Sequence, residues 1–253
     1  MAISVKQTNY QVATDYGFER ARRQTPEALG SLGVEAGPER LCRLPVLNAV
    51  FNIDLTERTV TFTQSDLKEA REGTVGQRWE ILALHYLCGK SVEQPPPAVG
   101  NNGRSVEQPP PAVNPQARAP VPHCSVRPQA GAPVLQQSVG WASFADFPDA
   151  RGYQSVYEAR VVRRLCATAG RNRECFIAAA ERLGGRTVPF GDVGYQFNVF
   201  PCAPVIVAWY EGDAEFPPNV SLLYPPNILE LLPAEDVVVF SECLVSRLQG
   251  KGW

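Results

Sequence analysis

The alternation of hydrophobic and polar positions divides this chain into short strands and amphipathic helices on either side of a long polar segment. Apolar positions at helical spacing, with N-cap, proline and glycine signals at their ends, predict the helices. Alternating or continuous apolar runs predict the strands. The predicted helices are Tyr10–Arg23, one that starts at Thr25 and Pro26, Gly76–Cys88, Tyr153–Cys166, Asn172–Leu183 and Pro233–Gln249; the predicted strands are Leu47–Ile53, Arg58–Phe62, Tyr195–Phe200 and Val205–Tyr210, with Val139–Phe144 as a short strand or loop. Together they predict an α+β domain with a mainly antiparallel sheet and packed helices.

Two of these helices carry enough apolar residues to lie deep in the core. The helix Gly76–Cys88 is apolar nearly all round, and its His85 is interpreted as a packed histidine bonded to backbone, in preference to a metal ligand or a base. The terminal helix begins at a proline, has acidic residues in its first turn, and ends before Gly250. Its predicted inner face consists of Val237, Phe240, Leu244 and Leu248.

A proline-rich segment interrupts the domain. The sequence 91–99 recurs letter for letter at 105–113, and eleven of the 23 prolines lie between residues 91 and 134. Because this stretch has no Leu, Ile, Met or aromatic residue, it cannot bury enough apolar surface to fold. We therefore expect residues 1–88 and 139–253 to form one domain around a disordered insert at 89–138. The insert is interpreted as a tolerated loop expansion; a docking segment for SH3-like or WW-like partners is the alternative.

Composition and charge exclude several classes of function. The 253 residues carry a net charge of -2, which gives no bulk attraction to nucleic acid or to an anionic membrane. No signal peptide or membrane-spanning run is recognised, so we expect a cytoplasmic location. The seven cysteines are widely spaced and contain no C-x-x-C pair, which favours reduced structural thiols over a site assembled from distant cysteines.

Charge is polarised along the second half of the chain. Residues 187–246 contain eight acidic residues and no lysine or arginine, whereas residues 151–186 contain eight arginines and three glutamates. One interpretation is that the two segments neutralise each other locally. The alternative is an acidic surface for a cation or a basic partner, and an arginine surface for an anion or an acidic partner.

Acidic side chains follow the buried strand that starts at Pro204. They occupy every second position as Glu211, Asp213 and Glu215, and two prolines follow them. With Asp192, these carboxylates supply the oxygen ligands that Mg²⁺ or Ca²⁺ prefers, so they are the candidate metal ligands. No cofactor other than such a divalent cation is suggested by the sequence.

Two further interpretations compete with the metal site. Two of these carboxylates could act as general acid and base, with one kept protonated by burial beside Trp209, Tyr210 or Phe216. The favoured interpretation is structural: Asp213 caps a turn, Gly212 supplies an unusual backbone angle, and Phe216 plugs the core. No nucleophile elbow or phosphate-binding loop is present to suggest other chemistry.

Several of these motifs together resemble a known family. They are His85-Tyr-Leu, Trp141-x-x-Phe144, Gly191-Asp192, Trp209-Tyr-Glu-Gly-Asp-Ala-Glu-Phe-Pro217 and the closing Pro233-x-Glu-Asp236. This set resembles the bacterial and archaeal family catalogued as domain of unknown function 3786, over nearly the whole chain outside the insert. Some members carry the domain behind a four-cysteine iron–sulfur domain and occur in anaerobic corrinoid and iron–sulfur metabolism. This chain has no such cysteine cluster, which weakens the transfer of cluster binding.

The sequence therefore indicates the position of a candidate site, the acidic residues after the buried strand, more clearly than it indicates a reaction. We expect a non-catalytic accessory or binding protein that works with an unidentified protein partner, without nucleic acid or membrane. The resemblance implies an association with corrinoid or iron–sulfur enzyme systems. The alternative is a metal-dependent enzyme that acts through Glu211, Asp213 and Glu215.

Overall fold

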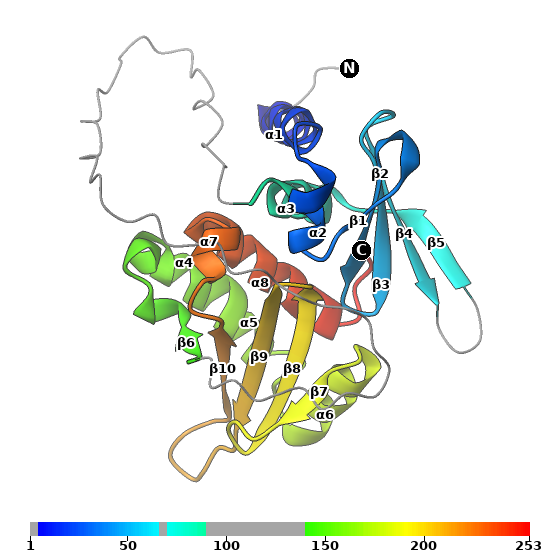
Figure 1. The fold of residues 1–253 in the computed structure, drawn as a ribbon. Helices are drawn as coiled ribbons and strands as arrows, with labels where there is room; N and C mark the ends of the chain where they lie inside the picture. Colours follow the sequence, from blue (N-terminus) through cyan, green and yellow to red (C-terminus); the bar gives the residue numbers. More distant parts are fainter. Residues whose placement is uncertain (1–4, 66–69, 90–139) are drawn as a thin grey trace, which may run out of the picture.

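Two antiparallel sheets form the framework of the molecule (Figure 1). The computed structural model describes residues 5–65, 70–89 and 140–253. The first sheet has the order β1-β2-β3-β4-β5 and the second β6-β10-β9-β8-β7. The strands are β1 (Glu35–Ala36), β2 (Leu41–Val46), β3 (Ala49–Asp54), β4 (Thr59–Ser65), β5 (Ala70–Thr74), β6 (Ala142–Ser143), β7 (Arg186–Val188), β8 (Val193–Phe200), β9 (Ala203–Tyr210) and β10 (Asn219–Tyr224). The α+β class is confirmed, but the strands form two sheets instead of one, because the strands of each half of the chain pair only among themselves.

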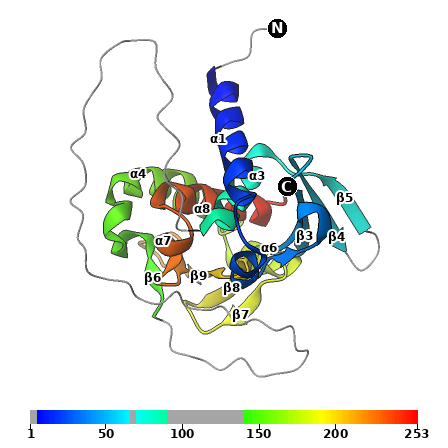
Figure 2. The ribbon, with the colours of Figure 1, turned by 45° about the horizontal axis from the view of Figure 1, so that its top comes forward.

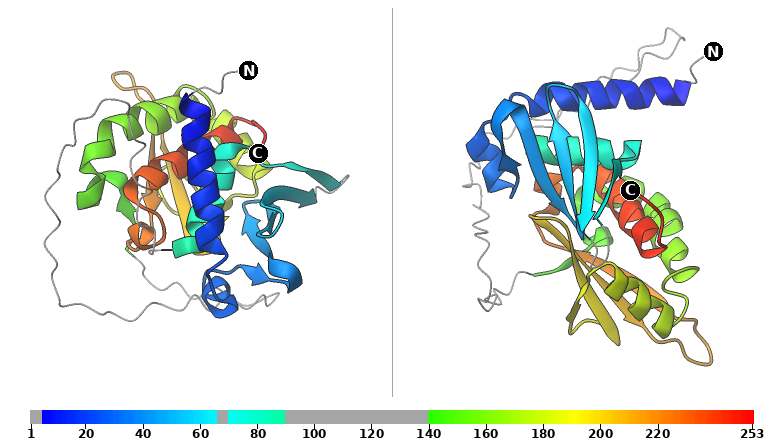
Figure 3. Two further views of the ribbon diagram at one scale, coloured as in Figure 1. Left: turned by 90° about the horizontal axis from the view of Figure 1, so that it is seen from above. Right: turned by 90° about the vertical axis from the view of Figure 1, so that its right-hand side faces the viewer.

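The helices pack between and around these sheets. α8, the terminal helix, lies between the two sheets, and α1 runs beside α3 (Figures 2 and 3). The helices are α1 (Val5–Ala21), α2 (Pro26–Ser31), α3 (Gln77–Cys88), α4 (Gln154–Tyr157), α5 (Arg163–Cys166), α6 (Arg173–Arg182), α7 (Ile228–Leu231) and α8 (Ala234–Leu248). Shorter 3-10 or π segments are η1 (Pro38–Arg40), η3 (Phe144–Asp146), η4 (Pro148–Tyr153) and η5 (Glu158–Val162). A π turn therefore interrupts the helix predicted at Tyr153–Cys166.

A line of aromatic rings joins the two halves of the chain through one core. Phe51 of β3 packs edge-on against Trp79 of α3, with ring centroids 5.9 Å apart. On the same helix, Tyr86 stacks on Phe200 of β8 at 4.5 Å, and Phe200 in turn lies 5.6 Å from Phe240 of α8. All five rings are at most 4% exposed. Because these rings come from both sheets and from the two helices between them, the described parts of the chain share one hydrophobic core.

Close packing of α1 on α3 depends on a glycine. A Cβ atom added at Gly17 would lie 2.9 Å from the Cβ of Leu84. Only a residue without a side chain therefore lets the two helices approach this closely at that turn. Leu84 is fully buried as a result, and α3 is covered by α1 on one side and by α8 on another.

The predicted insert at 89–138 lies, apart from Gly89, outside the described residues. The described residues that flank the undescribed stretch are Gly89, directly after α3, and Gly140, shortly before β6. Among the helices of the described ranges, none combines the length and apolarity that a membrane crossing requires.

Candidate functional site

The four predicted metal ligands lie at one end of the second sheet, where β9 turns into β10. The loop between Tyr210 and Asn219 is here called the acidic tip, and it projects from the sheet (Figure 1). Asp192 lies beside the base of the tip, because its Oδ2 accepts the backbone N–H of Glu211 at 2.8 Å. All four carboxylate residues, Asp192, Glu211, Asp213 and Glu215, are exposed.

Asp213 organises the tip as a turn. Its Oδ1 accepts the backbone N–H groups of Glu215 and Phe216, each at 2.8 Å, and its own N–H donates to the carbonyl of Phe216. These backbone hydrogen bonds lower the pKa of the Asp213 carboxyl below its ordinary value. The returning backbone lies so close to Gly212 that an added Cβ would be 2.6 Å from the carbonyl oxygen of Phe216. Asp213 thus closes the turn as predicted, whereas Gly212 has no positive φ and is required instead by the close approach of the returning backbone.

Phe216 does not plug the core. Its side chain is 67% exposed, so that prediction was wrong. The prolines that follow it direct the chain back along β10 before the ring reaches the apolar face of the sheet. The acid–base interpretation also lacks its physical basis at Asp213, because an exposed carboxyl with a lowered pKa is the opposite of a general acid kept protonated by burial.

The metal site proposed for the acidic tip stays a prediction. Within residues 5–65, 70–89 and 140–253, no group of three or more His, Cys, Asp or Glu side chains is arranged to hold a metal ion. A cation site made from Glu211, Asp213, Glu215 and Asp192 would therefore require the tip to rearrange.

A buried pair of polar side chains joins α3 to the start of α8. His85 Nδ1 lies 2.6 Å from Asp236 Oδ2, and the two side chains are only 10% and 13% exposed. The backbone partner expected for His85 is therefore wrong, since the ring bonds to a carboxylate 151 positions away. A carboxylate only accepts, so the Nδ1 hydrogen points to Asp236, and Nε2 is left buried with no hydrogen-bond partner among the described residues.

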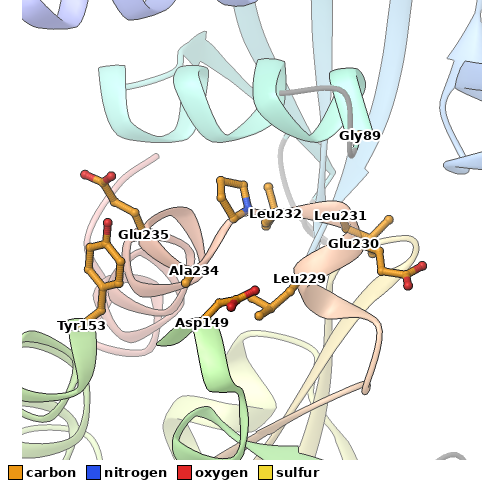
Figure 4. A pocket seen from close by; sticks show the side chains of 10 residues that line it. Gly89, Asp149, Tyr153, Leu229, Glu230, Leu231, Leu232, Ala234 and Glu235 are labelled. Carbon is orange, nitrogen blue, oxygen red and sulfur yellow. The ribbon is translucent and has the colours of Figure 1, made fainter. Parts of the chain in front are cut away.

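A pocket opens next to this pair, between the end of α3 and the start of α8. It has a volume of about 340 Å³, and we call it the α8 pocket. Its lining residues are Gly89, Asp149, Tyr153, Leu229, Glu230, Leu231, Leu232, Pro233, Ala234 and Glu235. Figure 4 shows the Asp149 carboxylate extending toward the Leu229 side chain, whereas Glu230 and Glu235 extend away from the centre. The pocket therefore combines an apolar floor with an acidic rim.

Tyr153 is the uncharged polar side chain of the pocket wall. Burial raises the pKa of its hydroxyl, and the Glu235 carboxylate, through its charge and a hydrogen bond, and the charge of Asp236 raise it further. The phenol therefore keeps its proton and acts as a hydrogen-bond donor. Tyr153 ends η4 and Glu235 lies in the first turn of α8, so their contact ties the two walls of the pocket together.

A second buried hydrogen-bond chain lies behind the same elements. The hydroxyls of Tyr157 and Tyr224 are 2.9 Å apart, and Tyr224 is 2.6 Å from the Ser241 hydroxyl. Ser241 in turn donates to the Val237 carbonyl within α8. Because every hydroxyl in the chain has a partner, it fixes α4, β10 and α8 relative to one another.

Sequence reasoning singled out the acidic tip but not the α8 pocket. Its lining comes from Gly89, from η4 and from 229–235, segments without a shared periodic pattern. The available signals were His85 and Asp236, which belong to two motifs of the family resemblance at opposite ends of the chain. Their contact in the structure, at 2.6 Å, is what places the pocket beside both motifs.

The six cysteines within the described ranges are free thiols. Cys42, Cys88 and Cys243 are buried, whereas Cys166, Cys175 and Cys202 are partly exposed. Cys124 lies outside the described residues. The buried thiols take part in the hydrophobic core, where a free cysteine packs as a small apolar residue.

Comparison with known proteins gives a family without an assigned activity. The family described as domain of unknown function (DUF3786) matches residues 101–247, which is more than half of the chain. The matched span starts within the predicted insert and ends within α8, so it includes η4, the acidic tip and α7. No curated protein and no solved structure matches the chain.

Proposed function

Given that the chain belongs to the family described as domain of unknown function (DUF3786), we propose that this protein is a non-catalytic binding protein whose ligand site is the α8 pocket. The observation that carries the proposal is the pocket itself, with a volume of about 340 Å³ and polar groups around an apolar floor. Ligand sites in proteins are typically concave, apolar and supplied with a few convergent polar groups.

The lining favours a small organic cation. The Asp149 carboxylate extends toward Leu229. Glu230 and Glu235 add negative charge at the rim, and none of the ten lining residues is basic. Three leucines and a proline supply apolar surface for the body of the ligand. The positive end of the α8 dipole is already offset by Glu235 and Asp236 in the first turn, so it does not repel a cation at the rim. A primary amine on a short apolar skeleton matches this chemistry.

The neighbouring polar groups support binding without reaction. His85 is not among the residues that line the pocket, and its Nε2 is closed off from solvent, so the ring braces α3 against α8 instead of reaching a ligand. The raised pKa of Tyr153 keeps its hydroxyl protonated, and the proton is shared with Glu235. No histidine, cysteine, serine, threonine or lysine among the described residues lines the pocket to act as a nucleophile, so its carboxylates are suited to pairing with the charge of a ligand.

The accessory role in the cytoplasm, beside a corrinoid or iron–sulfur enzyme system, is part of the proposal and depends on the family resemblance. A small binding protein of this kind would deliver or sense an amine for a larger enzyme. The metal-dependent enzyme with Glu211, Asp213 and Glu215 as ligands stays the alternative prediction, and the metal content of the purified protein is its test.

Ligand-observed NMR on the full chain tests the proposal. The probe is a set of small primary amines, each paired with the carboxylic acid of the same carbon skeleton. We expect the amines to bind and the acids not to. The variant Asp149→Asn should weaken amine binding about fivefold or more, because it removes a charge that faces the ligand.

The matched control is Glu174→Gln, which removes an exposed carboxylate on α6 outside the pocket and should leave the affinity unchanged. Equal binding of amines and acids would contradict the proposal, as would an Asp149→Asn variant with the affinity of the control. Thermal unfolding of all three proteins shows whether each variant keeps its fold.

A further inference from the structure

The acidic tip carries an aromatic side chain that is exposed to solvent. Phe216 is 67% exposed and Tyr210, at the end of β9, is 40% exposed. Within the described ranges, only two other large hydrophobic side chains are exposed to this degree, Val12 on α1 and Leu41 on β2. The two exposed aromatic residues thus lie on one hairpin.

The backbone of the tip is fixed although its ring is exposed. Asp213 accepts two backbone N–H groups, and Asp192 accepts that of Glu211 from outside the loop. Gly212 is packed against the returning backbone, and two prolines complete the loop. Below it, Trp209 is 2% exposed and donates its indole N–H to the Gly170 carbonyl at 2.9 Å. The tip is therefore anchored in the core while it presents Phe216 outwards.

The charges around the ring have one sign. Glu211, Asp213 and Glu215 belong to the tip, and Asp192 lies at its base. No lysine or arginine occurs between residues 187 and 246. Interfaces typically place aromatic anchors at the centre and charges at the rim, where opposite charges steer the partner.

We propose that the acidic tip is a docking surface for a basic protein segment with an apolar recess that receives Phe216. Lysine or arginine side chains of the partner surround the recess and pair with Glu211 and Glu215. The carboxylates of Asp213 and Asp192 are used within the fold, so they add charge without reaching out. Because the tip is already held in one conformation, little ordering is lost on binding.

This docking surface is independent of the α8 pocket. The tip precedes β10 and α7 follows it, so the two sites lie at opposite ends of this strand (Figure 1). Six residues of extended chain place its ends roughly 17 Å apart. The protein can therefore hold a ligand at one end of the second sheet and a partner at the other.

The negative charge of the tip favours a basic protein segment over the other molecules that could bind an exposed aromatic loop. A membrane surface with anionic lipids would repel four carboxylates, and so would a nucleic acid backbone. A second copy of this chain would have to offer its arginine-rich segment, residues 151–186, to the tip. A basic partner segment satisfies both the ring and the charges.

A random dodecapeptide display library, panned against the full chain, tests the docking surface. We expect enriched peptides to carry a net positive charge together with large apolar residues. A labelled peptide from this set should lose affinity by about tenfold or more with Phe216→Ala, the effect of truncating an aromatic hot spot. It should also bind more weakly to Glu211→Gln/Glu215→Gln and show less salt dependence there.

Val12→Ala is the matched control, since it truncates another exposed apolar side chain, 51% exposed, on α1. Its affinity should equal that of the unchanged protein. The proposal is overturned if no peptide is enriched, if the enriched peptides have no positive bias, or if Phe216→Ala binds like Val12→Ala. Concentration-dependent self-association, or binding to phosphatidylcholine vesicles, that is lost with Phe216→Ala would also overturn it in favour of that occupant.

Discussion

At the residue scale, His85 and Asp236 depend on each other for their place in the core. Each side chain is nearly enclosed, and a 2.6 Å contact between Nδ1 of His85 and Oδ2 of Asp236 joins them. A buried carboxylate that loses its donor must be desolvated without compensation. The pair therefore stabilises the contact of α3 with α8, next to the wall of the α8 pocket.

We expect Asp236→Asn to lower the free energy of unfolding by about 1.5–3 kcal/mol, the usual range for a hydrogen bond to a charged group. The amide keeps the volume of the side chain but offers His85 a neutral acceptor. Urea denaturation followed by tryptophan fluorescence measures the change, and an unaltered slope shows that the extent of unfolding is the same.

An exposed carboxylate outside the pocket supplies the comparison. Glu174→Gln on α6 changes the charge by the same amount, and a surface substitution of this kind should stay within about 0.5 kcal/mol of the unchanged protein. If Asp236→Asn is as stable as Glu174→Gln, the buried pair does not hold α3 and α8 together.

Residue types predicted some of these roles and missed others. Asp213 followed by polar and proline residues is a turn signal, and its side-chain bonds to the backbone confirm it. The partner of His85 could not be predicted, because 151 positions separate it from Asp236 and no local pattern links them. The exposure of Phe216 was missed because an aromatic residue after a buried strand is usually covered.

At the element scale, one carboxylate ties three helical segments together. Glu242 of α8 is 3% exposed; its Oε2 accepts from Arg78 of α3 at 2.8 Å, and its Oε1 accepts from Arg160 of η5 at 3.4 Å. The two arginine side chains are 50% and 61% exposed. The desolvation cost therefore concerns mainly the Glu242 carboxylate. The two arginines compensate its charge while their own side chains stay partly in solvent.

The difference in burial between Glu242 and its two arginines predicts how the stabilities of the following variants compare. Arg78→Ala/Arg160→Ala leaves Glu242 buried and unpaired, and should lower the free energy of unfolding by about 3 kcal/mol, the lower end of the range for such a charge. Adding Glu242→Leu to that double variant removes the charge and should recover most of the loss. Urea denaturation of both variants measures the difference.

A comparison with an exposed ion pair shows whether burial is the cause. Arg43→Ala breaks the pair with Glu35, whose side chains are 62% and 73% exposed, and should change stability by less than about 1 kcal/mol. A double arginine variant that loses no more than Arg43→Ala, or a triple variant that recovers nothing, would contradict the role given to Glu242.

Elements with strong periodicity or terminal signals were predictable. The helix starting at Thr25 and Pro26 is present with its Thr25 cap, and the hairpin of β3 and β4 is closed by Asp54. β2 was missed although its burial alternates, because Pro45 argues against a strand. It is tolerated there because β1 pairs with β2 only at Arg43 and Cys42, so no partner needs the missing N–H on that side.

At the scale of the whole molecule, the class could be predicted but the assembly could not. Amphipathic patterns give α+β, yet the division into two sheets depends on which strands meet in space. The α8 pocket likewise forms from η4, α7 and the start of α8, segments that are irregular or short. Sequence patterns predict which face of a helix or strand is buried. They do not predict a pocket that forms where several elements end.

The buried cysteines report on whether both halves unfold together. Cys42 lies in β2 of the first sheet and Cys243 in α8 beside the second. Burial raises the pKa of both thiols, that of Cys243 to about 12, so at pH 8 neither is a reactive thiolate in the folded protein. Because one aromatic core joins the sheets, we expect both thiols to become reactive only when the whole core opens.

Brief maleimide labelling across a urea series, read by peptide mass spectrometry, measures this coupling. Cys42 and Cys243 should be labelled at the same urea concentration, together with the change in tryptophan fluorescence. Cys175, partly exposed on α6, is the internal control and should be labelled without urea. Labelling of Cys42 at clearly lower urea would mean that the first sheet unfolds alone. In that case residues 1–88 would be a separate domain, and the ring contacts between Tyr86 and Phe200 would be an interface instead of a core.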